Sequence, residues 1–145
     1  MIEVHATKPE GFVASVEVAG CFIEIDNKIL FLERTRKKVS GGTWGVPGGK
    51  LEHNETPEQA AKRELFEETG ITAHSPLQYI YSLYMRLPHV DYIFHMFAAH
   101  FDQMPDVQLC DENDSYKWAT AKDLEEMPLI PGGKEAIEYY HAKKL

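Results

Sequence analysis

Three glutamates stand close together near the middle of the chain. If residues 57–69 form one helix, Glu64, Glu67 and Glu68 fall within an arc of about 100° on its surface, because successive helical residues turn by about 100°. Carboxylates gathered at the rim of a core need a counter-charge. A divalent cation supplies one, and oxygen ligands select Mg²⁺, with Mn²⁺ as the alternative. The spacing therefore points to metal-ion chemistry.

The residues around the glutamates carry clear helix signals. Thr56 is a good N-cap, and Pro57 suits the first helical position, where no backbone N–H is needed. Gln59 completes a capping-box pattern with Thr56. Gly70 can end the helix in a left-handed conformation. The sequence therefore predicts one helix over residues 57–69.

The same helix has an apolar side next to the acidic one. Ala61 and Leu65 lie beside the carboxylate arc and predict the face that meets a core. The single cation nearby, Arg63, cannot balance three carboxylates. A solvated acidic face with ordinary salt bridges is the alternative. The capping signals and the glycines upstream of the helix favour the metal site.

These residues belong to a longer pattern. Gly49 is followed by five residues and Glu55, then by seven residues and the run RELFEETGI from Arg63 to Ile71. The pattern resembles the signature of the Nudix family, G-x5-E-x7-R-E-U-x-E-E-x-G-U with U aliphatic, and every defined position matches. The resemblance implies an α/β/α sandwich and a magnesium-dependent hydrolase. Such enzymes cleave the diphosphate linkage of a nucleoside diphosphate attached to another group.

The resemblance also implies roles for individual residues. Glu67 and Glu68 would ligate the metal, Glu64 would be a ligand or a water-activating base, and the carbonyl of Gly48 would add a ligand. Arg63 enters the catalytic set with the three glutamates, and in this family it ties the loop before the helix to the helix itself. Three further positions of the motif would be structural: Gly49, Glu55 and Gly70. The residues themselves show one acidic face and a glycine pair that permits close backbone approach.

An acidic loop late in the chain, residues 102–114, is expected to complete the metal site. In the family a further carboxylate commonly lies about six residues before a tryptophan, and here Glu112 stands at that distance from Trp118. Asp111 and Asp114 are rivals, and a merely solvated loop is a further alternative. Coordination alone does not demand a ligand from this loop, because Mg²⁺ usually retains several waters.

Substrate-binding candidates flank the motif. Lys50 follows the glycines, and Arg34 and Arg36 begin the densest basic run of an acidic chain, so they could clamp phosphate groups. A solvated basic loop is the competing interpretation. Trp44 is the preferred aromatic for stacking on a base. Other aromatics could stack or belong to the core: Tyr81, Tyr84, Tyr92 and Phe94.

Two further features of the sequence bear on the substrate. The run from Arg34 to Gly49 resembles GDP-mannose mannosyl hydrolases, but this chain has a complete motif and carries Asn113 where those enzymes place a catalytic histidine. No asparagine in 128–133 matches the residue that reads guanine in enzymes cleaving 8-oxo-dGTP. We therefore expect a (d)NTP pyrophosphohydrolase that releases a nucleoside monophosphate. The alternatives are a nucleotide-sugar hydrolase, either GDP-mannose mannosyl hydrolase-like or an ADP-sugar pyrophosphatase, and a non-catalytic nucleotide sensor.

Length and composition limit the number of domains, the binding partners and the cellular location that we expect. With 145 residues and a net charge of −8, the chain suits one domain over 1–145, and its acidity argues against nucleic acid and anionic membranes as partners. We see no signal peptide and no spanning segment. Two cysteines without a disulfide framework indicate reduced thiols in the cytoplasm, with Cys21 in the core. A small nucleotide is the expected partner, and the family resemblance leaves a homodimer open.

Hydrophobic patterning predicts an α/β (α+β) fold with a mixed central sheet and helices on both faces. The turn signal at Asp26-Asn27 makes the first two strands a hairpin. Strands are expected at 12–26, 28–34, 44–46, 76–87, 91–101 and 115–118. Helical segments are expected at 57–69, 121–126 and 134–144.

Overall fold

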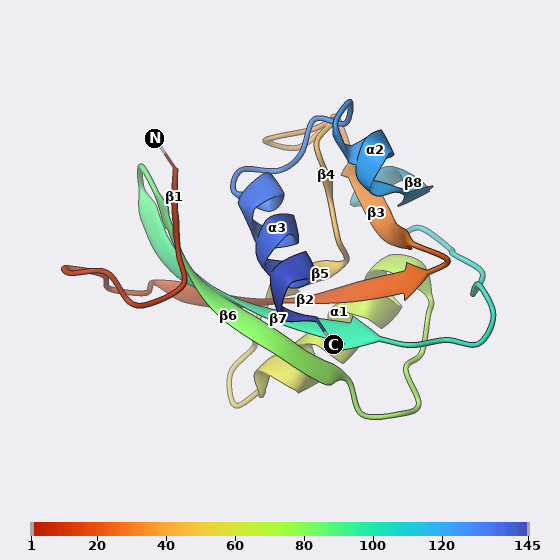
Figure 1. Ribbon diagram of the computed structural model, residues 1–145, viewed down its shortest axis with the longest axis horizontal. Coiled ribbons are helices and arrows are strands. Elements are labelled where there is room, and N and C mark those ends of the chain that lie inside the picture. Colours follow the sequence, from red (N-terminus) through yellow and green to blue (C-terminus); the bar gives the residue numbers. More distant parts are fainter. Residues whose placement is uncertain (1, 145) are drawn as a thin grey trace.

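The computed structural model describes residues 2–144 (Figure 1). Its strands are β1 (Glu3–His5), β2 (Val16–Ile25), β3 (Lys28–Arg34), β4 (Trp44–Gly45), β5 (Gly48–Lys50), β6 (Gln78–Leu87), β7 (Val90–Ala99) and β8 (Asn113–Ala119). Its helices are α1 (Pro57–Thr69), α2 (Ala121–Leu124) and α3 (Gly133–Lys143). Within this described range, no helix has the length and apolarity needed to cross a bilayer.

The sheet is mixed, as the sequence predicts. Its strands follow the order β1-β6-β7-β2-β3-β4, with β5 paired to β2 and β8 paired to β3. The β2–β7 pair is parallel, and the other strand pairs are antiparallel. Asp26 and Asn27 both have positive φ and form the tight turn between β2 and β3, which confirms the predicted hairpin.

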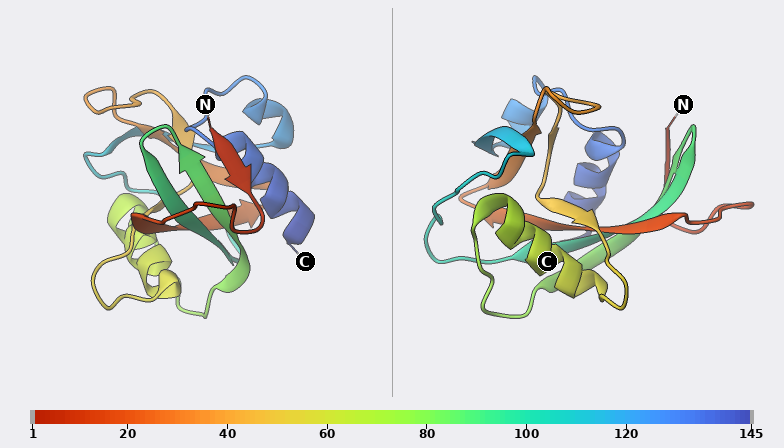
Figure 2. Two further views of the ribbon diagram at one scale, coloured as in Figure 1. Left: turned by 90° about the vertical axis from the view of Figure 1, so that its left-hand side faces the viewer. Right: turned by 180° about the vertical axis from the view of Figure 1, so that it is seen from behind.

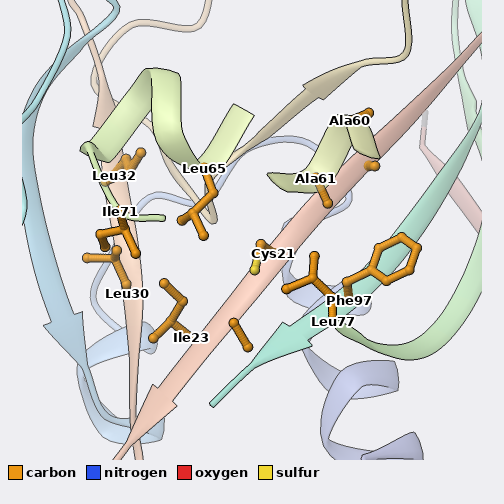
Figure 3. Close-up of a cluster of buried hydrophobic side chains, with 12 residues drawn as sticks. Cys21, Ile23, Leu30, Leu32, Ala60, Ala61, Leu65, Ile71, Leu77 and Phe97 are labelled. Atoms are coloured by element: carbon orange, nitrogen blue, oxygen red, sulfur yellow. The ribbon is translucent and has the colours of Figure 1, made fainter. Parts of the chain in front are cut away.

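Helices cover both faces of the sheet. In Figure 1 α3 lies in front of β2, and the reverse view in Figure 2 shows α1 against the opposite face. Alternation along β2 explains the two layers, because neighbouring strand residues point to opposite sides. Cys21 and Ile23 pack toward α1 with Leu65 (Figure 3). Phe22 points to the other face and packs against Tyr140 of α3.

The structure corrects some boundaries. The strand expected from residue 12 begins at Val16, because Phe12 instead packs edge-on against Tyr84 and is held beside a turn. The short strand β1 was not predicted. Strand β5 was not predicted either, because it has no alternating pattern to reveal it. Glycine is required there, because a Cβ on Gly48 would lie 2.6 Å from the carbonyl oxygen of Ala19 on β2.

Candidate active site

Helix α1 holds the acidic residues in a fixed orientation. It begins and ends as predicted: the Thr56 hydroxyl accepts from the N–H of Gln59, the Gln59 side chain accepts from the N–H of Thr56, and Gly70 is left-handed with φ of 73°. Its buried residues anchor it to the sheet, so the glutamates emerge at the border of that contact. These buried residues are Ala60, Ala61, Leu65 and Thr69.

Two of the glutamates press against the backbone of β5. A Cβ on Gly49 would lie 2.6 Å from Oε1 of Glu64, so only glycine leaves room for this carboxylate. The N–H of Gly48 donates to Oε1 of Glu68 at 2.8 Å. The glycine pair therefore brings main-chain atoms into the same site as the two carboxylates.

Arg63 ties these parts together. Its Nε and Nη2 donate to the two oxygens of Glu55 at 2.7 and 2.9 Å, and Nη2 also donates to the carbonyl of Lys50 at 3.0 Å. Its Nη1 donates to Glu64 at 2.8 Å and to Glu67 at 3.0 Å. Such bidentate pairing fixes the geometry of both partners. Arg63 thus joins the loop before the helix to the acidic face.

The environment works against ionisation of two carboxyls. Burial, followed by repulsion from Glu64 and Glu112, raises the pKa of Glu68 to about 8, although the Gly48 N–H opposes this. Burial also raises the pKa of Glu64, and Glu67 and Glu112 add to the effect against the opposing influence of Arg63. The positive charge around Glu64 and Glu68 is therefore too small to stabilise both carboxyls in their ionised form.

The late acidic loop reaches this site through backbone contacts. The N–H of Gln108 donates to the carbonyl of Thr69 at the end of α1, at 2.8 Å, and the N–H of Thr35 donates to the carbonyl of Glu112 at 2.9 Å. The Glu112 carboxylate accepts from Nζ of Lys38 at 2.7 Å. Asp114 instead accepts from the N–H of Arg36 at 3.1 Å.

The donor set fits a hard divalent cation. It consists of carboxylate and backbone oxygens, and its charges repel one another. In the described residues, no three histidine, cysteine, aspartate or glutamate side chains converge on one metal-sized point. Glu64 and Glu67 are turned toward Arg63 and Glu68 toward Gly48, so side-chain rotation is needed for all of them to share an ion.

Comparison with known proteins settles the family. The model of the NUDIX domain matches residues 15–140, which is most of the chain. The chain belongs to the Nudix hydrolase family. A CTP pyrophosphohydrolase of Escherichia coli K12 is 31% identical over 127 residues, covering 88% of this chain and 92% of the relative. Enzymes of the Nudix family generally use divalent metal ions.

Two further similarities agree with this assignment. An 8-oxo-dGTP diphosphatase of Proteus vulgaris is 53% identical over 53 residues, which are 37% of this chain and 47% of that protein. The crystal structure of a MutT NUDIX hydrolase from Burkholderia pseudomallei superposes with a TM-score of 0.73 at 27% identity, over 86% of this chain and 96% of that one. The predicted Nudix-type mixed fold is thereby confirmed.

The three basic residues predicted to bind substrate in this Nudix chain differ from one another in their contacts. The Nε of Arg34 donates to the carbonyl of Val39 at 2.7 Å, within its own loop. The Arg36 side chain is 77% exposed and contacts Glu33. Lys50 is exposed at the end of β5.

The predicted aromatic candidates lie beside a small cavity, against the N-terminal segment or at the core. Trp44 is half-buried and lines a small cavity of about 30 Å³ with Phe94 and Ile130. Tyr84 packs against Phe12, and the Tyr81 hydroxyl donates to the carbonyl of Ala6, so these two stabilise the N-terminal segment. Tyr92 is half-buried and packs against the core residues on the α3 side of the sheet, such as Phe22 and Tyr140.

Two features of the Nudix site were not predicted. Lys38 pairs with Glu112, and the Asn113 amide lies beside Glu68. Both depend on contacts between segments far apart in sequence. The basic run and the acidic loop were the available signals, since opposite charges in two loops favour their pairing.

Proposed function

We propose that this chain hydrolyses the phosphoanhydride of a (d)NTP, releasing a nucleoside monophosphate and pyrophosphate. The observation that carries the proposal is the packing of the Glu64 and Glu68 carboxylates against the backbone of Gly49 and Gly48, within a complete Nudix motif. In the reaction, water adds to a phosphorus atom and the bridging P–O bond breaks. Water supplies one proton to be removed, and the departing pyrophosphate carries away the bonding electron pair.

The proposed metal ligands are the carboxylates of Glu64, Glu67, Glu68 and Glu112 with the carbonyl of Gly48. When bound, Mg²⁺, or Mn²⁺ in its place, would neutralise phosphate charge and lower the pKa of a bound water. Support for these residues comes from the oxygen-only donor set and from the mutual repulsion of the carboxylates. Among the rivals in the loop, Glu112 is favoured because it is the one that acts electrostatically on both Glu64 and Glu68.

The chain's own residues supply orientation and proton handling. Arg63 holds Glu64 at the rim of the site, where a carboxylate can accept the proton of an attacking water. Lys50, Arg34 and Arg36 are the proposed phosphate contacts. Arg34, at the end of β3, pairs with Asn113 at the start of β8. The basic segment that starts at Arg34 therefore lies next to the acidic loop that ends at β8.

Trp44 is the proposed stacking residue for the base, supported by its place beside a small apolar cavity. The (d)NTP class is supported by the E. coli relative, whose name assigns it CTP and which matches nearly the full length of this chain. The P. vulgaris relative, named for 8-oxo-dGTP, points to the same class over a shorter match. Nucleotide sugars are the second candidate, favoured by the run from Arg34 to Gly49.

A product-resolved turnover screen with Mg²⁺ tests the function. The panel holds canonical and oxidised NTPs, ADP-ribose, nucleotide sugars and dinucleoside polyphosphates, with Glu68→Gln as the control variant. We expect a nucleoside monophosphate and pyrophosphate from an NTP, with turnover lost in the variant. Release of free sugar from a nucleotide sugar would instead show glycosyl transfer to water. Tight nucleotide binding with no turnover of any compound would indicate a sensor.

The loop ligand has its own test. Glu112→Ala should raise the Mg²⁺ concentration needed for half-maximal activity by about tenfold, since removing a metal ligand or its support commonly costs this much or more. Asp111→Ala is the matched control in the same loop and should leave the metal dependence unchanged. If the two variants behave alike, Glu112 is not the ligand.

A further inference from the structure

Asn113 occupies an unusual place at the edge of the site. It begins β8 directly after Glu112, and its N–H donates to the carbonyl of Cys110 at 3.3 Å. Opposite it on β3 is Arg34, and the strand register shifts between Glu33 and Arg34. This irregularity changes the alignment of side chains where the strand meets the acidic loop.

The side-chain nitrogen of Asn113, a half-buried residue, is itself buried and has no hydrogen-bond partner. In the part of the chain that the structure describes, its Nδ2 is the one buried side-chain nitrogen or oxygen atom without a hydrogen-bond partner. A buried donor left unpaired destabilises the folded chain, so native proteins retain few of them. Such a group at the edge of the proposed active site indicates an acceptor that side-chain rotation brings into reach.

The Glu68 carboxylate is a neighbouring candidate acceptor. The Asn113 amide lies beside this carboxyl, yet no hydrogen bond of good geometry joins the two groups. The Gly48 N–H already occupies Oε1 of Glu68. A carboxylate offers about four lone-pair positions, so a second donor and a cation can bind it together with Gly48.

We propose that Asn113 is a positioning residue, whose Nδ2 donates to the Glu68 carboxylate and aligns it for a divalent cation. The proposal rests on the proposed function, in which Glu68 is a metal ligand. With one donor from Gly48 on β5 and one from Asn113 on β8, the carboxylate is held from two sides. Side chains that orient a metal ligand in this way commonly contribute 10- to 100-fold in metal affinity or activity.

Binding of Mn²⁺ alone, without nucleotide, is the direct test. Free Mn²⁺ is measured by electron paramagnetic resonance for the wild type, Asn113→Leu and Asn113→His. Leucine keeps the size of asparagine without a donor, and at pH 8.5 a neutral histidine can present Nδ1–H at the same distance from the backbone. Tyr116→Leu, an exposed position on the same strand, is the matched control.

We expect Asn113→Leu to raise the Mn²⁺ Kd at least tenfold, Asn113→His to stay within about threefold of the wild type, and Tyr116→Leu to be unchanged. Turnover of Asn113→Leu should recover as Mn²⁺ is raised to saturation. Equal Mn²⁺ affinity in Asn113→Leu and the wild type would overturn the inference. If Asn113→Leu does not fold by circular dichroism, Asn113→Ala replaces it, with the same expected loss and the same contrary outcome.

The design separates this inference from the proposed function. A wild-type chain that binds no Mn²⁺ and turns over no nucleotide would remove the metal assignment itself. A wild type that binds Mn²⁺ and hydrolyses NTPs, while Asn113→Leu binds Mn²⁺ equally well, would leave the function standing and remove only the role of Asn113.

Discussion

Replacing Glu68 by glutamine should stabilise the metal-free protein at alkaline pH. Burial raises the pKa of this carboxyl from an ordinary value of 4.5 to about 8. Below pH 4.5 the carboxyl is protonated in both the folded and the unfolded chain, so it does not change the free energy of unfolding. Between 4.5 and 8 the folded chain binds more protons than the unfolded chain, so stability falls as the pH rises. Above pH 8 both states are ionised, and the free energy of unfolding no longer changes with pH through this group.

The size of the effect follows from the same values. At about 1.4 kcal/mol for each pH unit between 4.5 and 8, the largest possible loss is roughly 5 kcal/mol. Rotation of the side chain toward solvent relieves part of this, and we expect an observed difference of about 2 kcal/mol. Glutamine has no charge to bury, and its carbonyl oxygen can still accept from the Gly48 N–H, so the variant should escape the loss.

Urea unfolding in EDTA between pH 5 and pH 9 measures this difference. The free energy of unfolding of Glu68→Gln, relative to the wild type, should rise across the series by about 2 kcal/mol. Glu67→Gln is the matched control, because its carboxylate lies on the same helix but is 50% exposed. Parallel curves for the wild type and Glu68→Gln would refute the reasoning, since they would show that ionisation of this group costs the fold nothing.

Three other substitutions test the residues that hold the glutamates and helix α1 in place. Arg63→Leu should lower the free energy of unfolding by about 3 kcal/mol in urea titrations, because it leaves the carboxylate of Glu55 half-buried without its bidentate partner. Gly49→Ala should lower kcat by about 100-fold with an unchanged circular dichroism spectrum, because the added methyl group displaces Glu64. Gly70→Ala should cost about 1 kcal/mol in urea unfolding with kcat preserved, because φ of 73° strains any residue with a Cβ. A normal kcat for Gly49→Ala, or unchanged stability in either of the other variants, would contradict these expectations.

The sequence predicted the helix of the motif well because its signals are local. Thr56, Gln59 and Gly70 act within a few residues of themselves, so the observed bounds Pro57–Thr69 equal the predicted range. The hairpin between β2 and β3 was accessible for the same reason, since Asp26 and Asn27 adopt the positive φ that the turn requires.

The parts that sequence reasoning missed depend on distant partners. Strand β5 contains two glycines and no alternation, and only its pairing with β2 makes it a strand. The pairing of Lys38 with Glu112 joins residues 74 positions apart. Whether a polar side chain is satisfied depends on all its neighbours in space, so the unpaired amide of Asn113 has no signature in the sequence.

The contacts of Arg63 explain how one site can be stable both without and with a cation. In the structure Nη1 partly neutralises Glu64 and Glu67, while Nε and Nη2 hold Glu55 and the Lys50 carbonyl. In the proposed assignment a divalent ion takes over the charge of the two glutamates. Only the Nη1 contacts need to loosen for this, because the bidentate pair with Glu55 involves the other two nitrogens. In that assignment the loop before α1 would stay anchored while the carboxylates of Glu64 and Glu67 exchange the Arg63 contacts for a metal ion.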